Sequence, residues 1–140
     1  MKPIRWLTSR RLEHEGFPLY LRRPQYEDIW SYQEKFPGLL TVTHKFDQVK
    51  SNGLPESDYN KSLNDLDSKM VHMFDVKDGL IFLIETFGGE RNYYYFIAET
   101  TDYTSKVDAI RETETHADLE IDVRLDREWN FLRKYPVRIF

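Results

Sequence analysis

The chain has 140 residues and a mass of 16.9 kDa, and 31% of its residues are charged and 15% aromatic. This length suits one domain, and the aromatic content suffices to fill a core, which argues against intrinsic disorder. The absence of cysteine excludes disulfides, thiolate nucleophiles and sulfur-ligated zinc, while the net charge of −4 disfavours phosphate backbones as partners.

We expect residues 1–140 to form one domain, in which residues 1–37 are an N-terminal extension that packs on a core of residues 38–136. Residues 17–23 predict a short edge strand, which ends at Pro24 because proline cannot donate a ladder hydrogen bond. The rest of the extension carries scattered aromatic side chains and predicts an irregular connection with one helical turn.

Two elements follow the extension. Residues 39–46 alternate apolar and polar side chains with a period of two and predict a strand. After the turn at Asn52-Gly53, residues 55–74 predict the first helix, because Pro55 suits a first helical turn. The apolar stripe of this helix, at spacings of three and four, consists of Tyr59, Leu63, Leu66, Met70 and Phe74.

A β-hairpin is predicted for residues 79–87 and 91–99. The dipeptide Gly88-Gly89 separates two runs that are rich in β-branched and aromatic residues. Glycine enters the positive-φ regions of tight hairpin turns without steric cost, so this pair is a strong turn signal. The predicted fold class depends on this hairpin.

Residues 102–114 predict a second, shorter helix, with Thr101 or Asp102 as its cap. Residues 118–125 show the cleanest alternation in the chain and predict a strand with one face in water. The expected inward side chains of this strand are Leu119, Ile121, Val123 and Leu125.

A final helical piece is predicted around residues 126–135, and Pro136 ends it. The order of elements predicts an α+β fold: a ferredoxin-like βαββαβ sandwich with an extra N-terminal strand and irregular segment and a short C-terminal helix. Right-handed crossovers place both main helices on one face of the sheet, with strands 39–46 and 91–99 at its centre. The other face is then open, and something must cover it or use it.

Three segments carry a family resemblance: GLPESDYNKSLNDLDSKM (53–70), ETFGGERNYYYFIAE (85–99) and LDREWNFLRKYP (125–136), the last with Asp126 and Trp129 in an acid-x-x-tryptophan arrangement. In their order and spacing they resemble the domain-of-unknown-function family 695, over roughly residues 38–136. The resemblance implies a small, mostly bacterial α+β domain without an assigned reaction, similar in outline to the regulator of ribonuclease activity B. The N-terminal third departs from the family pattern.

No catalytic or metal-binding pattern stands out. The four histidines fall on different predicted elements without HxH or HxxxH spacing, and no serine lies in a nucleophile elbow. We therefore expect no metal, no cofactor and no enzymatic activity. No signal peptide and no long apolar run are present, so we expect a cytoplasmic protein without a membrane partner.

The aromatic run Tyr93-Tyr94-Tyr95-Phe96 is explained least by core filling. Its members alternate between the two sheet faces, so either Tyr93 and Tyr95 or Tyr94 and Phe96 face away from the helices. The chain's own aromatic N-terminal or C-terminal segment, or a partner, is expected to cover them. The predicted binding residues are Glu85, Arg91, Tyr93, Tyr95, Asp126 and Trp129.

Asp126 and Trp129 admit two interpretations. In the favoured one, Asp126 caps the last helix and the indole seals the end of the core. In the other, both residues form the rim of a pocket with Arg91 and Glu85.

These features favour a non-catalytic binding or regulatory domain that engages a protein, or a second copy of itself, through the open sheet face or the N-terminal segment. One alternative is a small-molecule enzyme or ligand-binding domain with a pocket near Arg91, Tyr95 and Trp129. Another is an RNA-binding regulator whose tyrosines stack on bases, which the acidic net charge disfavours.

Overall fold

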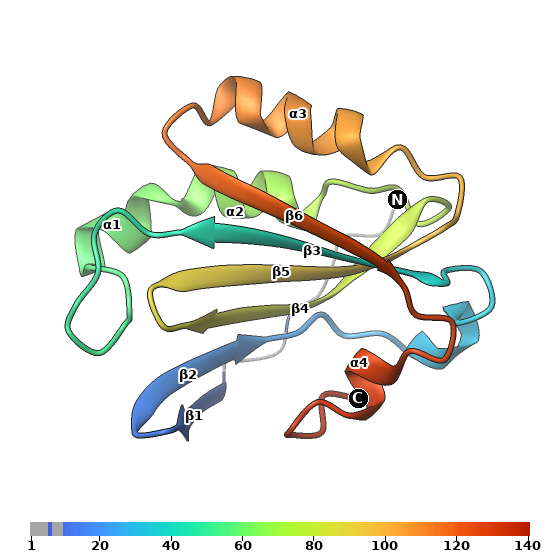
Figure 1. Ribbon diagram of the computed structural model, residues 1–140, viewed down its shortest axis with the longest axis horizontal. Helices are drawn as coiled ribbons and strands as arrows, with labels where there is room; N and C mark the ends of the chain where they lie inside the picture. The colour runs from blue at the N-terminus through green and yellow to red at the C-terminus, as the bar shows by residue number, and fades with distance from the viewer. Residues whose placement is uncertain (1–5, 7–9) are drawn as a thin grey trace.

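The computed structural model describes residue 6 and residues 10–140. Within these residues it is a mixed α/β fold, in which four α-helices accompany a six-stranded antiparallel sheet of order β1-β2-β4-β5-β3-β6 (Figure 1). In chain order the elements are β1 (Arg10–His14), β2 (Phe17–Arg22), the 3-10 helix η1 (Ile29–Tyr32), β3 (Gly38–Lys45), α1 (Ser57–Ser62), α2 (Asn64–Val71), β4 (Gly79–Phe87), β5 (Glu90–Ile97), α3 (Tyr103–Thr113), β6 (Asp118–Leu125) and α4 (Asn130–Arg133).

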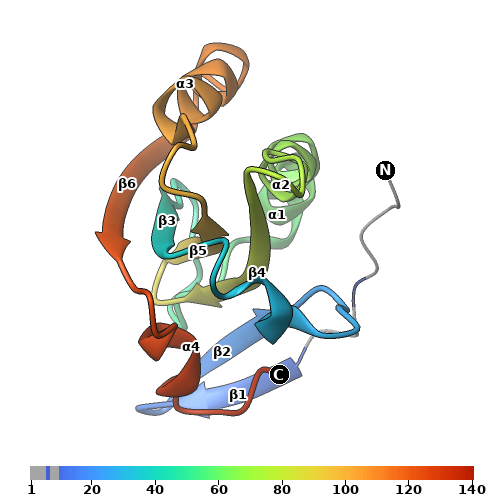
Figure 2. The same cartoon turned by 90° about the vertical axis from the view of Figure 1, so that its right-hand side faces the viewer.

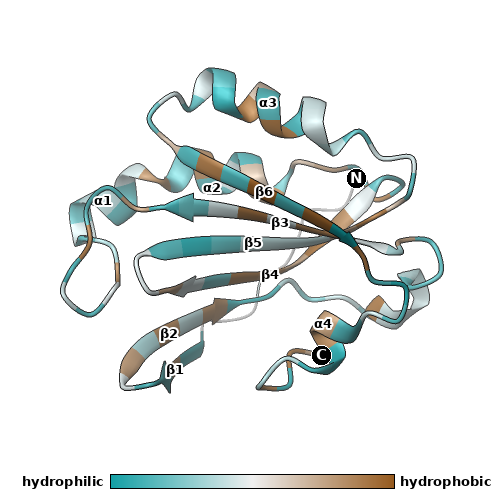
Figure 3. Ribbon diagram, in the orientation of Figure 1, coloured by the Kyte–Doolittle hydropathy of each residue, from teal (hydrophilic) through white to brown (hydrophobic). Residues whose placement is uncertain are grey.

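Strand β2 confirms the predicted strand at residues 17–23, but the expectation that it lies at an edge is wrong. It pairs with β4 on one side and with β1 on the other. The β1–β2 hairpin turns at Glu15 and Gly16, which both have positive φ, at 53° and 83°. Strand β1 has mostly exposed, polar side chains (Figure 3), so no alternation in the sequence indicates it.

The predicted helix over residues 55–74 is divided in two. Leu63, with φ −86° and ψ 0°, separates α1 from α2. Its N–H donates to the carbonyl of Asn60 at 3.2 Å, a three-residue spacing that tightens the chain and ends α1. The apolar stripe still predicts the buried side of the helix correctly, since Leu66 and Met70 of α2 are buried.

The hairpin over β4 and β5 is confirmed, and its turn also fixes the loop before α1. Gly88 and Gly89 have positive φ, at 62° and 84°. The N–H of Gly89 donates to the carbonyl of Gly53 at 2.8 Å. A Cβ on Gly53 would lie 3.0 Å from the Cα of Gly88, so only glycine permits this close approach between loop and hairpin.

Strand β5 lies between β4 and β3, and β3 lies between β5 and β6, as predicted. Helices α1, α2 and α3 lie on one side of the sheet and α4 on the other (Figure 2). Tyr93 and Tyr95 face α1–α3, whereas Tyr94 and Phe96 face α4. Both faces of β5 are therefore buried.

The face opposite α1–α3 is covered by the chain itself, which is one of the two coverings expected for it, and it is therefore not a free interaction surface. The segment around η1 and the C-terminal segment cover it with Ile29, Phe36, Trp129, Leu132 and Ile139, all buried. The Trp129 indole stacks on the Phe96 ring with centroids 3.9 Å apart, and its Nε1 donates to the carbonyl of Phe36 at 2.8 Å. The chain's own aromatic segments thus cover the sheet.

Strand β6 is buried only where it begins. Leu119 is 6% exposed, but Val123 is 37% and Leu125 64% exposed, so the inward placement expected for these two is wrong. Helix α3 holds the beginning of β6, where Arg111 donates to the carbonyl of Leu119 at 2.7 Å. Beyond this contact, apolar and polar side chains still alternate along β6 (Figure 3), but both kinds are exposed to solvent at the end of the strand.

We predict that Trp129→Ala lowers the free energy of unfolding by about 3–5 kcal/mol, because it removes a fully buried indole and leaves a cavity over β5. Urea denaturation measures the change. Leu125→Ala, at an exposed apolar position, is the control and should change stability by less than about 0.5 kcal/mol. Equal effects of the two substitutions would contradict the covering role of Trp129.

Candidate functional site

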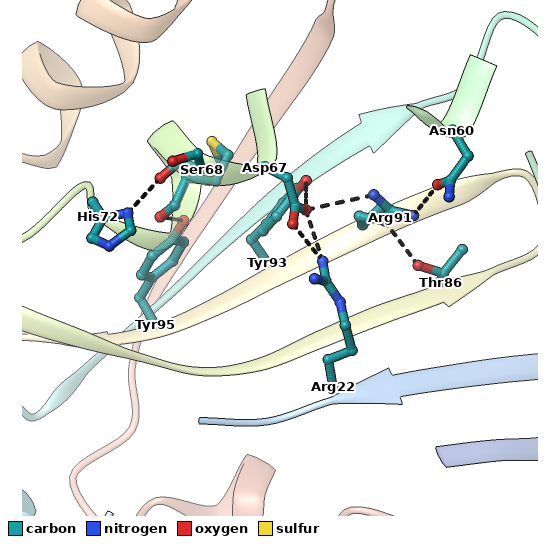
Figure 4. Close-up of polar contacts among 10 residues, drawn as sticks. Arg22, Asn60, Asp67, Ser68, His72, Thr86, Arg91, Tyr93 and Tyr95 are labelled. Carbon is teal, nitrogen blue, oxygen red and sulfur yellow. Dashed lines mark hydrogen bonds and ion pairs between the residues drawn. The ribbon is translucent and has the colours of Figure 1, made fainter. Parts of the chain in front are cut away.

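A partly buried charged network lies on the helix side of the sheet, near the end of the β4–β5 hairpin (Figure 4). Its centre is Arg91 on β5, which is 8% exposed and is the one arginine or lysine that is buried within residues 10–140. Buried charges require partners, because desolvation of an unpaired ion is costly. Three elements supply these partners: α1 with Asn60, α2 with Asp67 and β4 with Thr86.

The carboxylate of Asp67 on α2 is shared by three donors (Figure 4). Arg22 Nη2 donates to both carboxylate oxygens, at 2.8 and 2.7 Å. Tyr93 Oη donates to Oδ1 at 2.9 Å, and Arg91 Nη1 lies 3.5 Å from the same oxygen. One acidic side chain therefore serves two arginines.

The Arg91 guanidinium is held in a fixed orientation. Its Nε donates to Thr86 Oγ1 at 2.9 Å, and its Nη2 donates to Asn60 Oδ1 at 2.8 Å. The Phe46 ring lies under the guanidinium, with its centroid 5.5 Å from Cζ. Such fixed, forked donors are suited to oxygen anions.

A cavity of about 440 Å³ opens onto this network. Its charged lining is Arg22, Lys50, Asp67 and Arg91, and the remaining lining residues are Tyr20, Leu54, Pro55, Ser57, Asn60, Asn64, Ile84 and Thr86. The loop that Gly53 anchors on the hairpin turn contributes Lys50, Leu54 and Pro55 to the wall. Three positive side chains and one negative side chain leave the cavity a formal charge of +2.

The tyrosine hydroxyl in the network remains a donor. Burial, and next the Asp67 carboxylate, raise the pKa of Tyr93 well above its ordinary value, because both oppose a phenolate. Burial likewise raises the pKa of Tyr95, whose hydroxyl donates to the carbonyl of Met70 at 2.6 Å. Neither tyrosine lines the cavity, and Tyr95 acts in the core.

Glu85 lies on the opposite face of the sheet. It accepts hydrogen bonds from Asn92 at 2.9 Å, from Tyr94 at 3.1 Å and from Tyr135. Burial, followed by Glu85, raises the pKa of Tyr94 far above its ordinary value. Glu85 and Asp126 line a second cavity of about 490 Å³ between β6 and α4.

Asp126 caps the C-terminal helix, in agreement with the favoured interpretation. Its carboxylate accepts from the N–H groups of Asn130 at 2.8 Å and Phe131 at 3.1 Å. Trp129 seals the core and is fully buried. The pocket of the alternative interpretation, near Arg91, Tyr95 and Trp129, does not form, because Trp129 lies on the other side of the sheet from the other two.

Sequence reasoning identified Arg91 and Tyr93 but missed their shared partner Asp67, together with Arg22 and Lys50 as cavity residues. Asp67 follows Leu66 of the apolar stripe directly, and this position beside the buried face is the one signal for it. Arg22 joins the site through the pairing of β2 with β4, where it lies opposite Ile84. No local pattern encodes that pairing.

Two further properties concern the described part of the chain. Its histidine, aspartate and glutamate side chains form no group of three that could hold a metal ion. None of its helices combines the length and apolar character needed to cross a bilayer.

The fold and cavity define a small α/β domain with a positively charged site beside a six-stranded sheet. The chain belongs to a family of unknown function, DUF695, whose model matches residues 27–135. The match confirms the predicted resemblance and begins before residue 38, so it includes η1. No curated protein and no solved structure matches the chain significantly.

His44 on β3 lies opposite Arg91 in the strand register and is 1% exposed. Burial, and next Arg91, lower the pKa of His44 below its ordinary value of 6.5, while Asp47 and Asp118 act in the opposite direction. The unfolded chain therefore binds this proton at higher pH than the folded protein. Stability from His44 is present above about pH 6.5 and is lost as the pH falls below that value.

We predict that the free energy of unfolding of the wild-type protein falls relative to that of His44→Gln as the pH decreases from about 7.5 to about 5.5. Each unit of difference between folded and unfolded pKa contributes about 1.4 kcal/mol to this loss. Urea denaturation across the pH range measures it, with His116→Gln as the same change at an exposed position. Parallel curves for wild type and His44→Gln would contradict the prediction.

Proposed function

We propose that this protein is a ligand-binding domain that takes an anionic group of its ligand into the cavity between β2, α1–α2 and the β4–β5 hairpin. The observation that supports this proposal is the charge imbalance of the cavity. Three cations, Arg22, Lys50 and Arg91, line the cavity together with one carboxylate, that of Asp67, in a chain whose net charge is −4. An anion in the cavity would supply the negative charge that the protein lacks at this place.

The energetics of burial support the proposal. The Arg91 side chain is only 10% exposed. Its counter-charge, the carboxylate of Asp67, already accepts hydrogen bonds from Arg22 on both of its oxygens. An incompletely compensated buried cation is costly. A bound anion would form charge-assisted hydrogen bonds with both arginines and would offset part of this cost.

Binding without turnover is the activity that the lining favours. The lining side chain with the character of a general base is Asp67, and its oxygens are engaged by Arg22, Arg91 and Tyr93. A base that holds such partners is poorly placed to abstract a proton from a ligand. We therefore propose a binding or regulatory role and no catalytic one.

Binding in the cavity is favoured over binding on the sheet. A protein partner on the sheet face away from α1–α3 would have to displace Trp129 and the segment around η1. Base stacking on the tyrosines meets the same obstacle, because Tyr93, Tyr94 and Tyr95 are each at most 8% exposed. Protein and RNA partners are thus alternatives to a ligand in the cavity, and binding experiments distinguish between them.

We also propose that β3, α1–α2, β4, β5, α3 and β6 form a ferredoxin-like unit. The strand order β4-β5-β3-β6 and the position of α1–α3 on one face support this relationship. Strands β1 and β2 lie outside this unit and extend its sheet beside β4. The cavity lies where β2 meets the unit.

Arg22→Gln tests the proposed function. We predict that inorganic phosphate raises the melting temperature of the wild-type protein at constant ionic strength, and that Arg22→Gln weakens phosphate binding about tenfold to a hundredfold. The loss corresponds to one charge-assisted hydrogen bond of about 1.5–3 kcal/mol. Calorimetric titration and thermal unfolding measure the dissociation constant and the stabilisation.

The matched control is Lys106→Gln on α3, which removes one positive charge at an exposed position outside the cavity. It should retain wild-type binding. If phosphate, sulfate and acetate all leave the wild-type protein unchanged, or if the two variants respond equally, the proposed function is wrong.

A further inference from the structure

We infer that the ligand of this cavity is a phosphate monoester of a small polar molecule, bound as a dianion. This inference rests on the proposed anion-binding function and specifies its ligand class. It combines the charge of the cavity, the arrangement of its donors and its size.

The charge of the cavity matches a dianion. Its formal charge of +2 comes from three cations and one carboxylate, so a monoanion would leave one positive charge uncompensated. A phosphate monoester carries about two negative charges above its second pKa of about 6. A carboxylate or a phosphodiester carries one.

The donors occupy two different positions. Arg22, on β2, and Arg91, on β5, reach the Asp67 carboxylate from different strands (Figure 4). Asp67 fills the position between them, so a ligand would accept from other N–H groups, such as those of Arg22 Nε and Nη1, which form no hydrogen bond with the described residues. Lys50 lines the same cavity from the loop before α1 and is exposed. A phosphoryl group, with three terminal oxygens, can accept from separate donors at once, whereas a planar carboxylate has two oxygens.

The cavity has room for more than a phosphoryl group. Its volume of about 440 Å³ lies in the range of small-molecule sites, which is about 300–1,000 Å³. The helical wall carries Ser57 and Asn64, whose side chains form no hydrogen bond with other described residues. Hydroxyl and amide groups of this kind suit a ligand body that is polar and uncharged.

The experiment compares four probes by calorimetric titration with the full chain at about pH 8: ribose 5-phosphate, ribose, gluconate and inorganic phosphate. Ribose 5-phosphate should bind at least about tenfold more tightly than gluconate, because it forms an additional charge-assisted hydrogen bond. It should also bind more tightly than inorganic phosphate, which cannot reach Ser57 and Asn64, and ribose should not bind.

The protonation state of the ligand provides a second test. As the pH falls from about 8 to about 5, the ester gains a proton and becomes a monoanion, so its affinity should fall toward that of gluconate. Gluconate retains its charge over most of this range and provides the reference for effects of pH on the protein itself.

Two variants test the match of charge. Lys50→Gln changes an exposed side chain and should weaken the binding of ribose 5-phosphate about threefold to tenfold, with a smaller effect on the binding of gluconate. The control Lys106→Gln should leave the binding of both ligands unchanged.

Asp67→Asn removes the shared counter-charge of Arg22 and Arg91. Ribose 5-phosphate should therefore raise the melting temperature of Asp67→Asn more than that of wild type. If Asp67→Asn does not fold, Lys50→Gln decides.

The outcomes separate the two proposals. If gluconate binds as tightly as ribose 5-phosphate, the dianion inference is wrong and the anion-binding function stands. If inorganic phosphate binds as tightly as the ester, or a short single-stranded RNA binds more tightly, a small monoester is not the ligand. If none of the anions binds, both proposals fail.

Discussion

The carboxylate of Asp67 connects three parts of the fold through its polar contacts. It binds Arg22 on β2, Arg91 on β5 and the hydroxyl of Tyr93, and thereby joins the N-terminal addition, helix α2 and the centre of the sheet. Because its charge serves two arginines, the network is held together and remains deficient in negative charge. The same interaction thus stabilises the site and underlies the affinity for anions that we propose.

The opposite face of the sheet is stabilised by a different kind of interaction. There the Trp129 indole stacks on Phe96, and its N–H is satisfied by the carbonyl of Phe36, so a large aromatic surface is buried without an unpaired donor. Asp126 accepts hydrogen bonds from the N–H groups of the first turn of α4, which directly follows Trp129. Tyrosines that the sequence presents as a possible contact surface are therefore part of the core, and the polar chemistry of the chain lies at the hairpin end of the sheet.

Local signals predicted those elements whose stability is local. The Gly88-Gly89 turn, the Asp102 cap on Ser105 and the apolar stripe of α2 each follow from a few neighbouring residues. Strand β1 was missed because its exposed side chains show no alternation, and Val123 and Leu125 were misplaced because alternation does not reveal how far α3 covers β6. Arg91 was predicted as a binding residue, but its charged partner Asp67 was not.

The sequence by itself determined the kinds of elements, the central position of β5 and membership in the family, since these depend on periodicity, turn chemistry and the order of motifs. Only the tertiary structure decided which segments cover the sheet and which charges meet. Arg22 and Asp67 are separated by 45 positions, and Trp129 and Phe36 by 93. Contacts over such separations depend on strand pairing and chain closure, which no local pattern of residues specifies.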